Sequence, residues 1–131
     1  MPSIFTHIIR GEIPSHRVAE DDAFVAFLDI RPIRPGHTLV VPKQEVDHFF
    51  DMDDHLLARA LVFSKPISQA IRQVTGADRV GAVVAGFDVA HAHLHLIPAD
   101  SMRDLEFSRA RDASYAELDA MAQRIRRALQ S

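Results

Sequence analysis

Residues 91–98 read HAHLHLIP, in which every second position is a histidine: His91, His93 and His95. The intervening positions are apolar: Ala92, Leu94 and Leu96. A β-strand puts residues i, i+2 and i+4 on one face, whereas a helix would spread them around its circumference. Neighbouring imidazoles on such a strand stand roughly 7 Å apart. The pattern therefore predicts a strand with one apolar face and one face of imidazoles, which can bind a phosphate, attack it or bind a metal.

Length and composition narrow the class of protein. The chain has 131 residues, enough for a single domain over 1–131 with its own core. Its 15 basic and 18 acidic side chains leave a net charge of -3, which argues against a nucleic-acid or membrane partner. Cysteine is absent, so disulfides and thiolate metal sites are excluded, and a reducing compartment is favoured. Because the sequence also shows no signal segment and no apolar run of ~20 residues, we expect a cytoplasmic protein.

The first third of the chain predicts one short helix and three strands. Apolar residues recur at helical spacing after Ser3, a good N-cap, and Gly11 ends the pattern. Three runs with the β-branched and aromatic residues typical of strands follow, over residues 16–20, 23–30 and 38–41. The first two are joined by a turn-forming Asp pair and are expected to form a hairpin.

The remaining two thirds predict two further strands and two helices. A 3.6-residue apolar period indicates the longest helix over residues 53–75, ended by Gly76. A strand over 79–85 then pairs antiparallel with the histidine strand. Residues 99–113 carry charges without periodicity and are expected to form a loop. A capping box, Ser114 with Glu117, begins a C-terminal helix.

Four blocks, in this order, resemble the histidine triad nucleotide-binding family. They are IFTHIIRGEIP at 4–14, FVAFLDI at 24–30, PGHTLVVPK at 35–43 and HAHLHLIP at 91–98. The resemblance implies an α+β fold with a five-stranded antiparallel sheet, one long central helix and a C-terminal helix. It also implies a homodimer whose sheets join into a continuous ten-stranded one. Residues 1–98 match the family core, and the tail over 99–131 adds nothing specific to the match.

The resemblance also assigns roles to individual residues. It implies a purine nucleotide with its α-phosphate against the triad, where His93 is the nucleophile. The flanking His91 and His95 help to orient it and hold the phosphate, and His37, from the PGHTLVVPK block, approaches the same catalytic site. Asp29 matches the ligand of the ribose hydroxyls, although it can equally accept turn amides. The positions that match the base pocket, and that ordinary core packing would also explain, are Phe5, Ile8, Phe27 and Ile30.

The chemistry of imidazole supports a metal-independent hydrolase or transferase. A neutral imidazole is a good nucleophile toward phosphorus, and the phosphoryl-nitrogen bond that forms is later cleaved by water. Hydrogen-bond donors around the phosphate stabilise its charge without a metal, so no cofactor is expected. The candidate substrates are nucleoside phosphoramidates, dinucleoside polyphosphates and acyl-nucleotides, each cleaved at the α-phosphorus through a nucleotidyl-histidine.

The chain departs from the family pattern in two regions. Many relatives have glutamine and then serine or threonine before the triad, where this chain has Phe87 and Asp88. An ionised Asp88 would repel a phosphate but suits a cationic amine leaving group. Relatives that bind structural zinc use cysteines near the N-terminus, where this chain has Thr6 and His7, so we expect no structural zinc.

Two other functions remain open from the sequence. Phe87 and Asp88 are compatible with a nucleotide-binding protein that has little turnover. Two histidines at i and i+2 on a strand can also share a zinc ion, with His37 as a third ligand. The chain would then be a histidine-based metal-binding protein.

Overall fold

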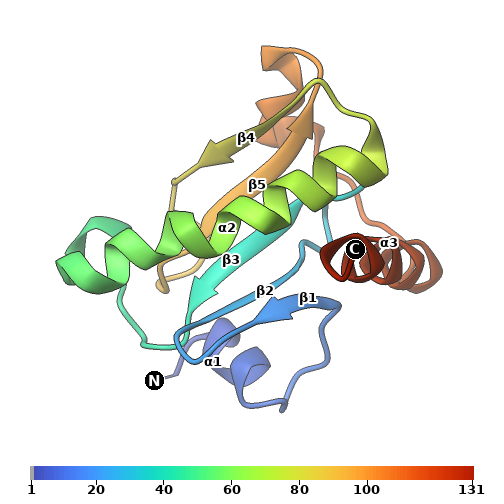
Figure 1. The fold of residues 1–131 in the computed structure, drawn as a ribbon. Helices are drawn as coiled ribbons and strands as arrows, with labels where there is room; N and C mark the ends of the chain where they lie inside the picture. The colour runs from blue at the N-terminus through green and yellow to red at the C-terminus, as the bar shows by residue number, and fades with distance from the viewer. Residues whose placement is uncertain (1) are drawn as a thin grey trace.

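The computed structural model describes residues 2–131 and contains a five-stranded antiparallel sheet in the order β1-β2-β3-β5-β4 (Figure 1). The strands are β1 Arg17–Glu20, β2 Phe24–Leu28, β3 Thr38–Pro42, β4 Arg79–Val83 and β5 Leu94–Ala99. The first three strands follow one another across the sheet, the chain then crosses to β4 at the far edge, and β5 returns between β3 and β4. The predicted α+β fold with its five-stranded sheet is confirmed.

The long helix α2, Asp54–Thr75, makes the crossing from β3 to β4. The side chain of Asp53 caps it by accepting a 2.8 Å hydrogen bond from the backbone N–H of Leu56. Gly76 ends it at a φ of +72°, a conformation that favours glycine. The residues buried at helical spacing are Ala60, Ser64, Ile67, Ala70 and Ile71. Helix α2 is therefore the helix predicted over residues 53–75.

Two shorter helices lie on opposite faces of the sheet. Helix α3, Tyr115–Leu129, begins at the predicted capping box, where Ser114 Oγ accepts a hydrogen bond from the Glu117 N–H at 3.1 Å. It packs with α2 against one face of the sheet (Figure 1). Helix α1, Ile4–Ile9, is capped by Ser3 and packs against the other face.

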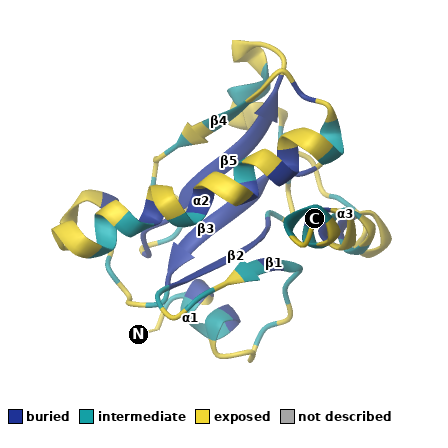
Figure 2. Ribbon diagram, viewed as in Figure 1, coloured by how far each residue is buried: buried dark blue, intermediate teal, exposed yellow. Residues whose placement is uncertain are grey.

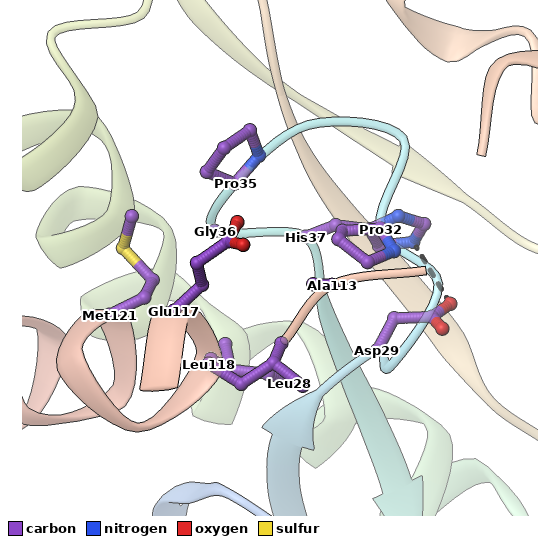
Figure 3. Close-up of a pocket in the computed structure, with 10 residues that line it drawn as sticks. All are labelled: Leu28, Asp29, Pro32, Pro35, Gly36, His37, Ala113, Glu117, Leu118 and Met121. Atoms are coloured by element: carbon purple, nitrogen blue, oxygen red, sulfur yellow. Dashed lines mark ion pairs between the residues drawn. The ribbon is translucent and has the colours of Figure 1, made fainter. Parts of the chain in front are cut away.

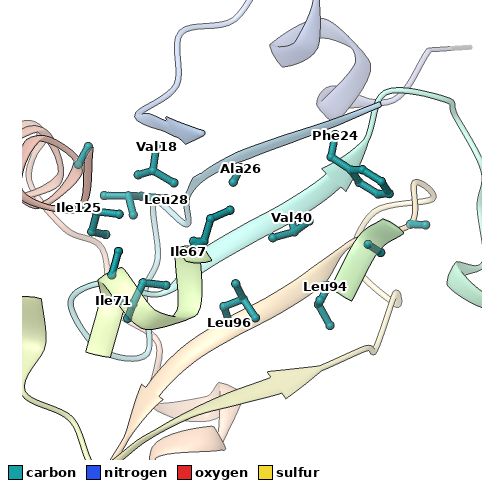
Figure 4. Close-up of a cluster of buried hydrophobic side chains, with 14 of the residues drawn as sticks. Val18, Phe24, Ala26, Leu28, Val40, Ile67, Ile71, Leu94, Leu96 and Ile125 are labelled. Carbon is teal, nitrogen blue, oxygen red and sulfur yellow. The ribbon is translucent and has the colours of Figure 1, made fainter. Parts of the chain in front are cut away.

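The sheet separates two hydrophobic clusters. The larger cluster joins the sheet to α2 and α3, and Figure 4 shows ten of its side chains: Val18, Phe24, Ala26, Leu28, Val40, Ile67, Ile71, Leu94, Leu96 and Ile125. The smaller cluster, under α1, contains Phe5, Ile8, Val25, Phe27, Leu39 and Val41. Successive strand residues point to opposite faces of the sheet, and a cluster covers each face. Strands β2 and β3 are therefore buried throughout (Figure 2). Any chemistry on the α1 side therefore lies across the sheet from the main core.

The histidine strand is shorter than predicted, because β5 begins at Leu94 and not at His91. Strand β3 pairs with β5 through Leu39 opposite His95 and Val40 opposite Leu94. The same register would place Pro42 opposite Ala92, and proline has no N–H to give to a sheet ladder. The Ala92 N–H instead donates to the carbonyl of Val46, at 2.6 Å. His91 and His93 therefore lie in an irregular segment that leads into β5.

Other boundaries differ from the prediction too, among them the end of β2, at Leu28 and not at residue 30. Strand β4 ends at Val83 and not at residue 85. Residues 99–113, expected to be a loop, contain two short 3-10 helices, Met102–Leu105 and Phe107–Arg109. Both form through local backbone hydrogen bonds, and the side chains show no periodicity that would predict them. Within residues 2–131, no helix combines the length and the apolar character that crossing a membrane requires.

Candidate active site

Four histidines are buried together on the face of the sheet that carries α1. His91, His93, His95 and His37 are at most 3% exposed. Between the triad histidines, Ala92 and Leu94 point into the main core on the other face. The predicted division into an imidazole face and an apolar face is therefore confirmed, even though the regular strand begins late. The rings of His93 and His95 are close neighbours, with centroids 5.0 Å apart.

His93 has one ring nitrogen held and one free. Its Nδ1 lies 2.7 Å from the backbone carbonyl of His91. A carbonyl oxygen only accepts, so Nδ1 carries the proton and the neutral ring has its lone pair on Nε2. That Nε2 is buried and makes no hydrogen bond, although a carboxylate oxygen that would pair with a protonated ring, Asp88 Oδ1, lies 3.3 Å away. The site therefore contains an uncommitted imidazole lone pair, the group that a nucleophile requires.

His37 and His95 form a relay of two neutral imidazoles. The Ile33 N–H donates to His37 Nδ1 at 3.1 Å, so the proton of neutral His37 sits on Nε2. His37 Nε2 lies 2.9 Å from His95 Nδ1 and donates to it. The proton of neutral His95 is therefore on Nε2. His95 can offer that N–H to a phosphate oxygen, and His37, from the loop before β3, holds it in place.

His91 is held at both ring nitrogens. Its Nε2 donates to the carbonyl of Pro42 at 2.8 Å, and its Nδ1 lies 2.7 Å from Ser3 Oγ. The ring therefore does not offer a free nitrogen to a ligand. Its contribution to the site is the backbone carbonyl, which accepts the hydrogen bond from His93 Nδ1–H.

Asp29 lies beside the relay, where its Oδ2 is 3.7 Å from His37 Nε2. Its Oδ1 accepts a 2.9 Å hydrogen bond from the Arg31 N–H, so the turn-capping role considered from the sequence is present. Burial raises the pKa of Asp29. One carboxylate oxygen is thus committed to the turn, and the other faces the histidines.

The four candidate base-pocket residues divide into two groups. Phe5, Ile8 and Phe27 are buried in the smaller cluster, and the Phe5 ring meets the His93 ring edge-on at 5.1 Å between centroids. Ile30, by contrast, is 66% exposed beyond the end of β2. The first three therefore pack in the buried cluster that supports the histidines, whereas Ile30 is free to contact a ligand.

The loop before the triad places Asp88, but not Phe87, at the site. Asp88 Oδ1 lies 3.3 Å from His93 Nε2, although the Asp88 side chain is 72% exposed. Phe87 is 98% exposed and points into solvent. A carboxylate thus stands at the mouth of the site, beside the uncommitted lone pair.

Sequence reasoning missed Phe107, which belongs to the tail over residues 99–131. Its ring packs edge-on against the His95 ring, with centroids 4.8 Å apart, and lies 6.3 Å from the His37 ring. The residues that carried the family resemblance, 1–98, do not include it. No short-range pattern marks Phe107, because a 3-10 helix distant in sequence brings it to the relay.

A small crevice lies behind Asp29 and His37, where α3 meets the loop before β3 (Figure 3). Its other lining residues are Leu28, Pro32, Pro35, Gly36, Ala113, Glu117, Leu118 and Met121. His93 does not line it, so this crevice is separate from the nucleophile. It shows instead that α3 packs behind the loop that carries both residues.

Metal binding fits the relay poorly. Asp29, His37 and His95 each place one possible ligand atom within 4.8 Å of the others. For His37 Nε2 to bind a metal, the ring proton would have to move to Nδ1. The Ile33 N–H already points at Nδ1, so that move would set two donors against each other. The protons of this cluster are thus arranged for a hydrogen-bond relay.

The sheet, the central helix and the four buried histidines together define a histidine triad protein, and comparisons with known proteins agree. The HIT domain pattern matches residues 10–102. The Saccharomyces cerevisiae adenosine 5'-monophosphoramidase HNT1 is 36% identical over 96 residues, which cover 72% of this chain and 61% of that relative.

Solved structures extend the similarity over nearly the whole chain. A Hit-like protein from Bartonella henselae superposes with a TM-score of 0.85 at 34% identity, covering 96% of this chain and 95% of its own. A histidine triad nucleotide-binding protein from Sulfolobus tokodaii gives a TM-score of 0.86 at 27% identity, covering 96% and 91%. The chain therefore belongs to the HIT domain family, a family of nucleotide-binding hydrolases.

The relay predicts a pH dependence of stability. Burial, and then the neighbouring His95, lowers the pKa of His37 to about 3, and burial followed by His93 lowers that of His95 to about 4. Unfolded histidines take up protons near pH 6.5, so below that pH the unfolded state binds more protons than the folded one. This stability is complete above about pH 6.5 and is lost as the pH falls. We expect a loss of about 1.4 kcal/mol per pH unit for each histidine between about pH 6 and 4.5.

Urea unfolding at a series of pH values measures this slope. His37→Asn should reduce it by about one proton. The matched control is His48→Asn, which removes an exposed histidine. Equal slopes for the two variants would contradict the assignment of a neutral, buried His37.

Proposed function

We propose that this protein hydrolyses a nucleoside 5'-phosphate derivative at its α-phosphorus, with His93 as the nucleophile. The observation that carries the proposal is the buried, unpartnered Nε2 of His93. Leaving a buried polar atom without a hydrogen bond costs free energy, so such an atom in a histidine cluster calls for a functional reason. Attack on phosphorus gives that reason.

The reaction then proceeds in two displacements. The Nε2 lone pair forms a bond to the α-phosphorus while the bond to the leaving group breaks, and the electron pair departs with the leaving group. An amine leaving group is already protonated on its nitrogen in the bound substrate, so it departs as the neutral amine. Water next attacks the same phosphorus, loses a proton and displaces His93 as a neutral imidazole. Nucleoside monophosphate is released, and each of the two steps is easier than one direct displacement.

The relay supplies stabilisation of the phosphoryl charge. The N–H on His95 Nε2 can donate to a phosphoryl oxygen, and the orientation of that N–H is set by His37. Donors fixed before the reaction need no reorganisation when charge moves, so they can stabilise the transition state without a metal. We therefore propose a metal-independent reaction.

The nucleotide would lie between Asp29 and the smaller cluster. The Oδ2 of Asp29 is free to accept hydrogen bonds from ribose hydroxyls, because only Oδ1 is committed to the turn. A purine base would rest on the exposed Ile30, while Phe5, Ile8 and Phe27 would form the buried support beneath the site. The activity for which HNT1 is named, on an adenosine 5'-monophosphoramidate, supports this substrate class.

Asp88 favours an amine leaving group. Its carboxylate lies 3.3 Å from the nucleophilic nitrogen, so a departing group passes close to a negative charge. A protonated amine is attracted there, whereas a departing phosphate is repelled. Among the candidate substrates, we therefore propose a nucleoside phosphoramidate.

We also propose that two copies pair through their β4 edges, which would join the sheets into ten strands. In residues 2–131, β4 is an edge strand of the sheet, and an unpaired edge is a template for another chain. Beside it, α2 exposes Leu61 and Val62, which are 62% and 73% exposed. These side chains would be covered by the α2 helix of the second copy. A cytoplasmic location stays a prediction.

Replacement of the nucleophile should abolish turnover. We expect His93→Ala to lower kcat for an adenosine phosphoramidate by at least about four orders of magnitude. AMP affinity should change little, because the alanine removes no proposed ribose or base contact. A rapid quench of the wild type in alkaline denaturant should trap nucleotide on His93, because the bond between phosphorus and the imidazole nitrogen is acid-labile. The exposed His48→Ala is the control.

Two outcomes would contradict the proposal. Turnover by His93→Ala would exclude His93 as the nucleophile. AMP binding by a wild type that neither turns over nor forms an adduct would point to a binding protein with little turnover.

A change of charge at Asp88 should alter the choice of leaving group. We expect Asp88→Asn to lower kcat/KM for the phosphoramidate relative to a dinucleoside polyphosphate by about tenfold, since an exposed charge is partly screened. Steady-state kinetics on both substrates measures the ratio. Asp54→Asn, at the start of α2, removes an exposed carboxylate without touching the site. An unchanged ratio in Asp88→Asn would remove Asp88 from substrate selection.

The pairing surface predicts an oligomeric state. Light scattering should give the mass of a dimer for the wild type and of a monomer for Leu61→Glu/Val62→Glu, because facing charges would be buried between the helices. Tyr115→Glu is a matched control, since this residue is 73% exposed on α3. A wild-type monomer, or a dimer that survives the double substitution, would refute this surface.

A further inference from the structure

A polar cluster fastens the start of α1 to the segment that carries the triad. We define the Glu45 clasp as Ser3, Thr6, Glu45 and His91. Glu45 Oε1 lies 2.6 Å from the Ser3 backbone nitrogen and 2.8 Å from Thr6 Oγ1. Ser3 Oγ in turn lies 2.7 Å from His91 Nδ1. Segments 3–6, 45 and 91, far apart in the sequence, are thus joined by hydrogen bonds.

The direction of each bond follows from what the groups can donate. A carboxylate only accepts, so the Ser3 N–H and the Thr6 hydroxyl both donate to Glu45. The hydrogen bond from the Ser3 N–H and then that from Thr6 lower the pKa of Glu45 to about 2, so it is charged at neutral pH. Ser3 Oγ accepts from the Thr6 N–H at 3.0 Å and keeps its own proton for His91.

His91 links the clasp to the nucleophile His93. The Ser3 hydroxyl donates to Nδ1, and Nε2 donates to the Pro42 carbonyl, so one tautomer of His91 satisfies both partners. The ring, 0% exposed, is thereby fixed together with its own backbone. The backbone carbonyl of His91 accepts a hydrogen bond from His93 Nδ1–H, with 2.7 Å between oxygen and nitrogen. The lone pair of the neutral His93 ring is therefore on Nε2.

We propose that Glu45 is a positioning residue for His93, acting through Ser3 and His91 to hold the nucleophile in its reactive tautomer; this inference rests on the proposed function. Glu45 itself does not touch the phosphate. Its Oε1 lies 3.9 Å from His91 Nδ1. When the nucleotidyl group bonds to Nε2, the His93 ring becomes cationic, and its Nδ1–H still donates to the His91 carbonyl that the clasp holds in place.

A purely structural role for the clasp predicts a different result. If Glu45 only anchored α1, its loss would lower the melting temperature without changing the state of His93. The chain offers a matched control at the other end of the same helix, where the exposed Glu12 pairs with His7 at 2.7 Å. Glu12→Gln removes an equivalent carboxylate that has no bonded path to the triad.

The experiment measures ring tautomers and kinetics together. In wild-type protein, ¹⁵N spectra of the histidine side chains should show His93 with its proton on Nδ1 only. In Glu45→Gln and in Ser3→Ala we expect a mixture of His93 tautomers and a roughly tenfold fall in kcat, with KM for the phosphoramidate unchanged. The double variant should lose no more than the worse single variant, since both substitutions break one path. Glu12→Gln should match the wild type in both measurements.

Two results would overturn the proposal: a His93 that keeps the single Nδ1–H tautomer in Glu45→Gln, or a kcat for Glu45→Gln equal to that of Glu12→Gln. The tautomer measurement needs no substrate. If the wild type proves to have no turnover, the proposed hydrolysis fails, while the ¹⁵N spectra still decide whether Glu45 sets the state of His93.

Discussion

The hydrogen bond from His93 Nδ1 to the backbone carbonyl of His91 determines what the rest of the site can do. Because a carbonyl cannot donate, this one 2.7 Å contact forces the proton of the neutral ring to one side and the lone pair to the other. If the proton sat on Nε2 instead, the lone pair would face the backbone, and neither His93 nor His95 would offer an acceptor nitrogen to a ligand. The irregular segment before β5 makes the contact possible, because a regular ladder would have committed this carbonyl to a neighbouring strand.

The two-sided sheet allows the fold to bury these polar rings without losing its main hydrophobic core. Its α2 and α3 face carries the large cluster, so the α1 face can hold four buried histidines without emptying the main core. Burial disfavours their charged forms, and the pKa values of His37 and His95 fall accordingly. Neutral rings can act both as donors and as acceptors, whereas protonated rings only donate. Burial thus keeps the rings neutral, and only neutral rings allow a nucleophile and a hydrogen-bond donor to lie side by side.

Much of this arrangement could be predicted from the sequence, because it follows from local patterns. Alternation placed the triad on one face, apolar periodicity placed α2, and the capping box placed the start of α3. The contacts of Phe107 and Glu45 could not be predicted, since they depend on how distant loops meet. The start of β5 was wrong for a related reason: proline in the partner strand ends the ladder, and the histidine run alone carries no sign of its partner.

Two chains of hydrogen bonds reach the site, and they end with opposite polarity. One runs from the Ile33 N–H through His37 to His95 and presents an N–H. The other runs from Glu45 and Ser3 through His91 to His93 and leaves a lone pair. Phosphoryl transfer needs both, a donor for the developing oxygen charge and an acceptor nitrogen for phosphorus. The first chain begins at a backbone N–H, and the second reaches His93 through a backbone carbonyl. Neither group can reverse its role, so the opposite polarity is built into the fold before any ligand arrives.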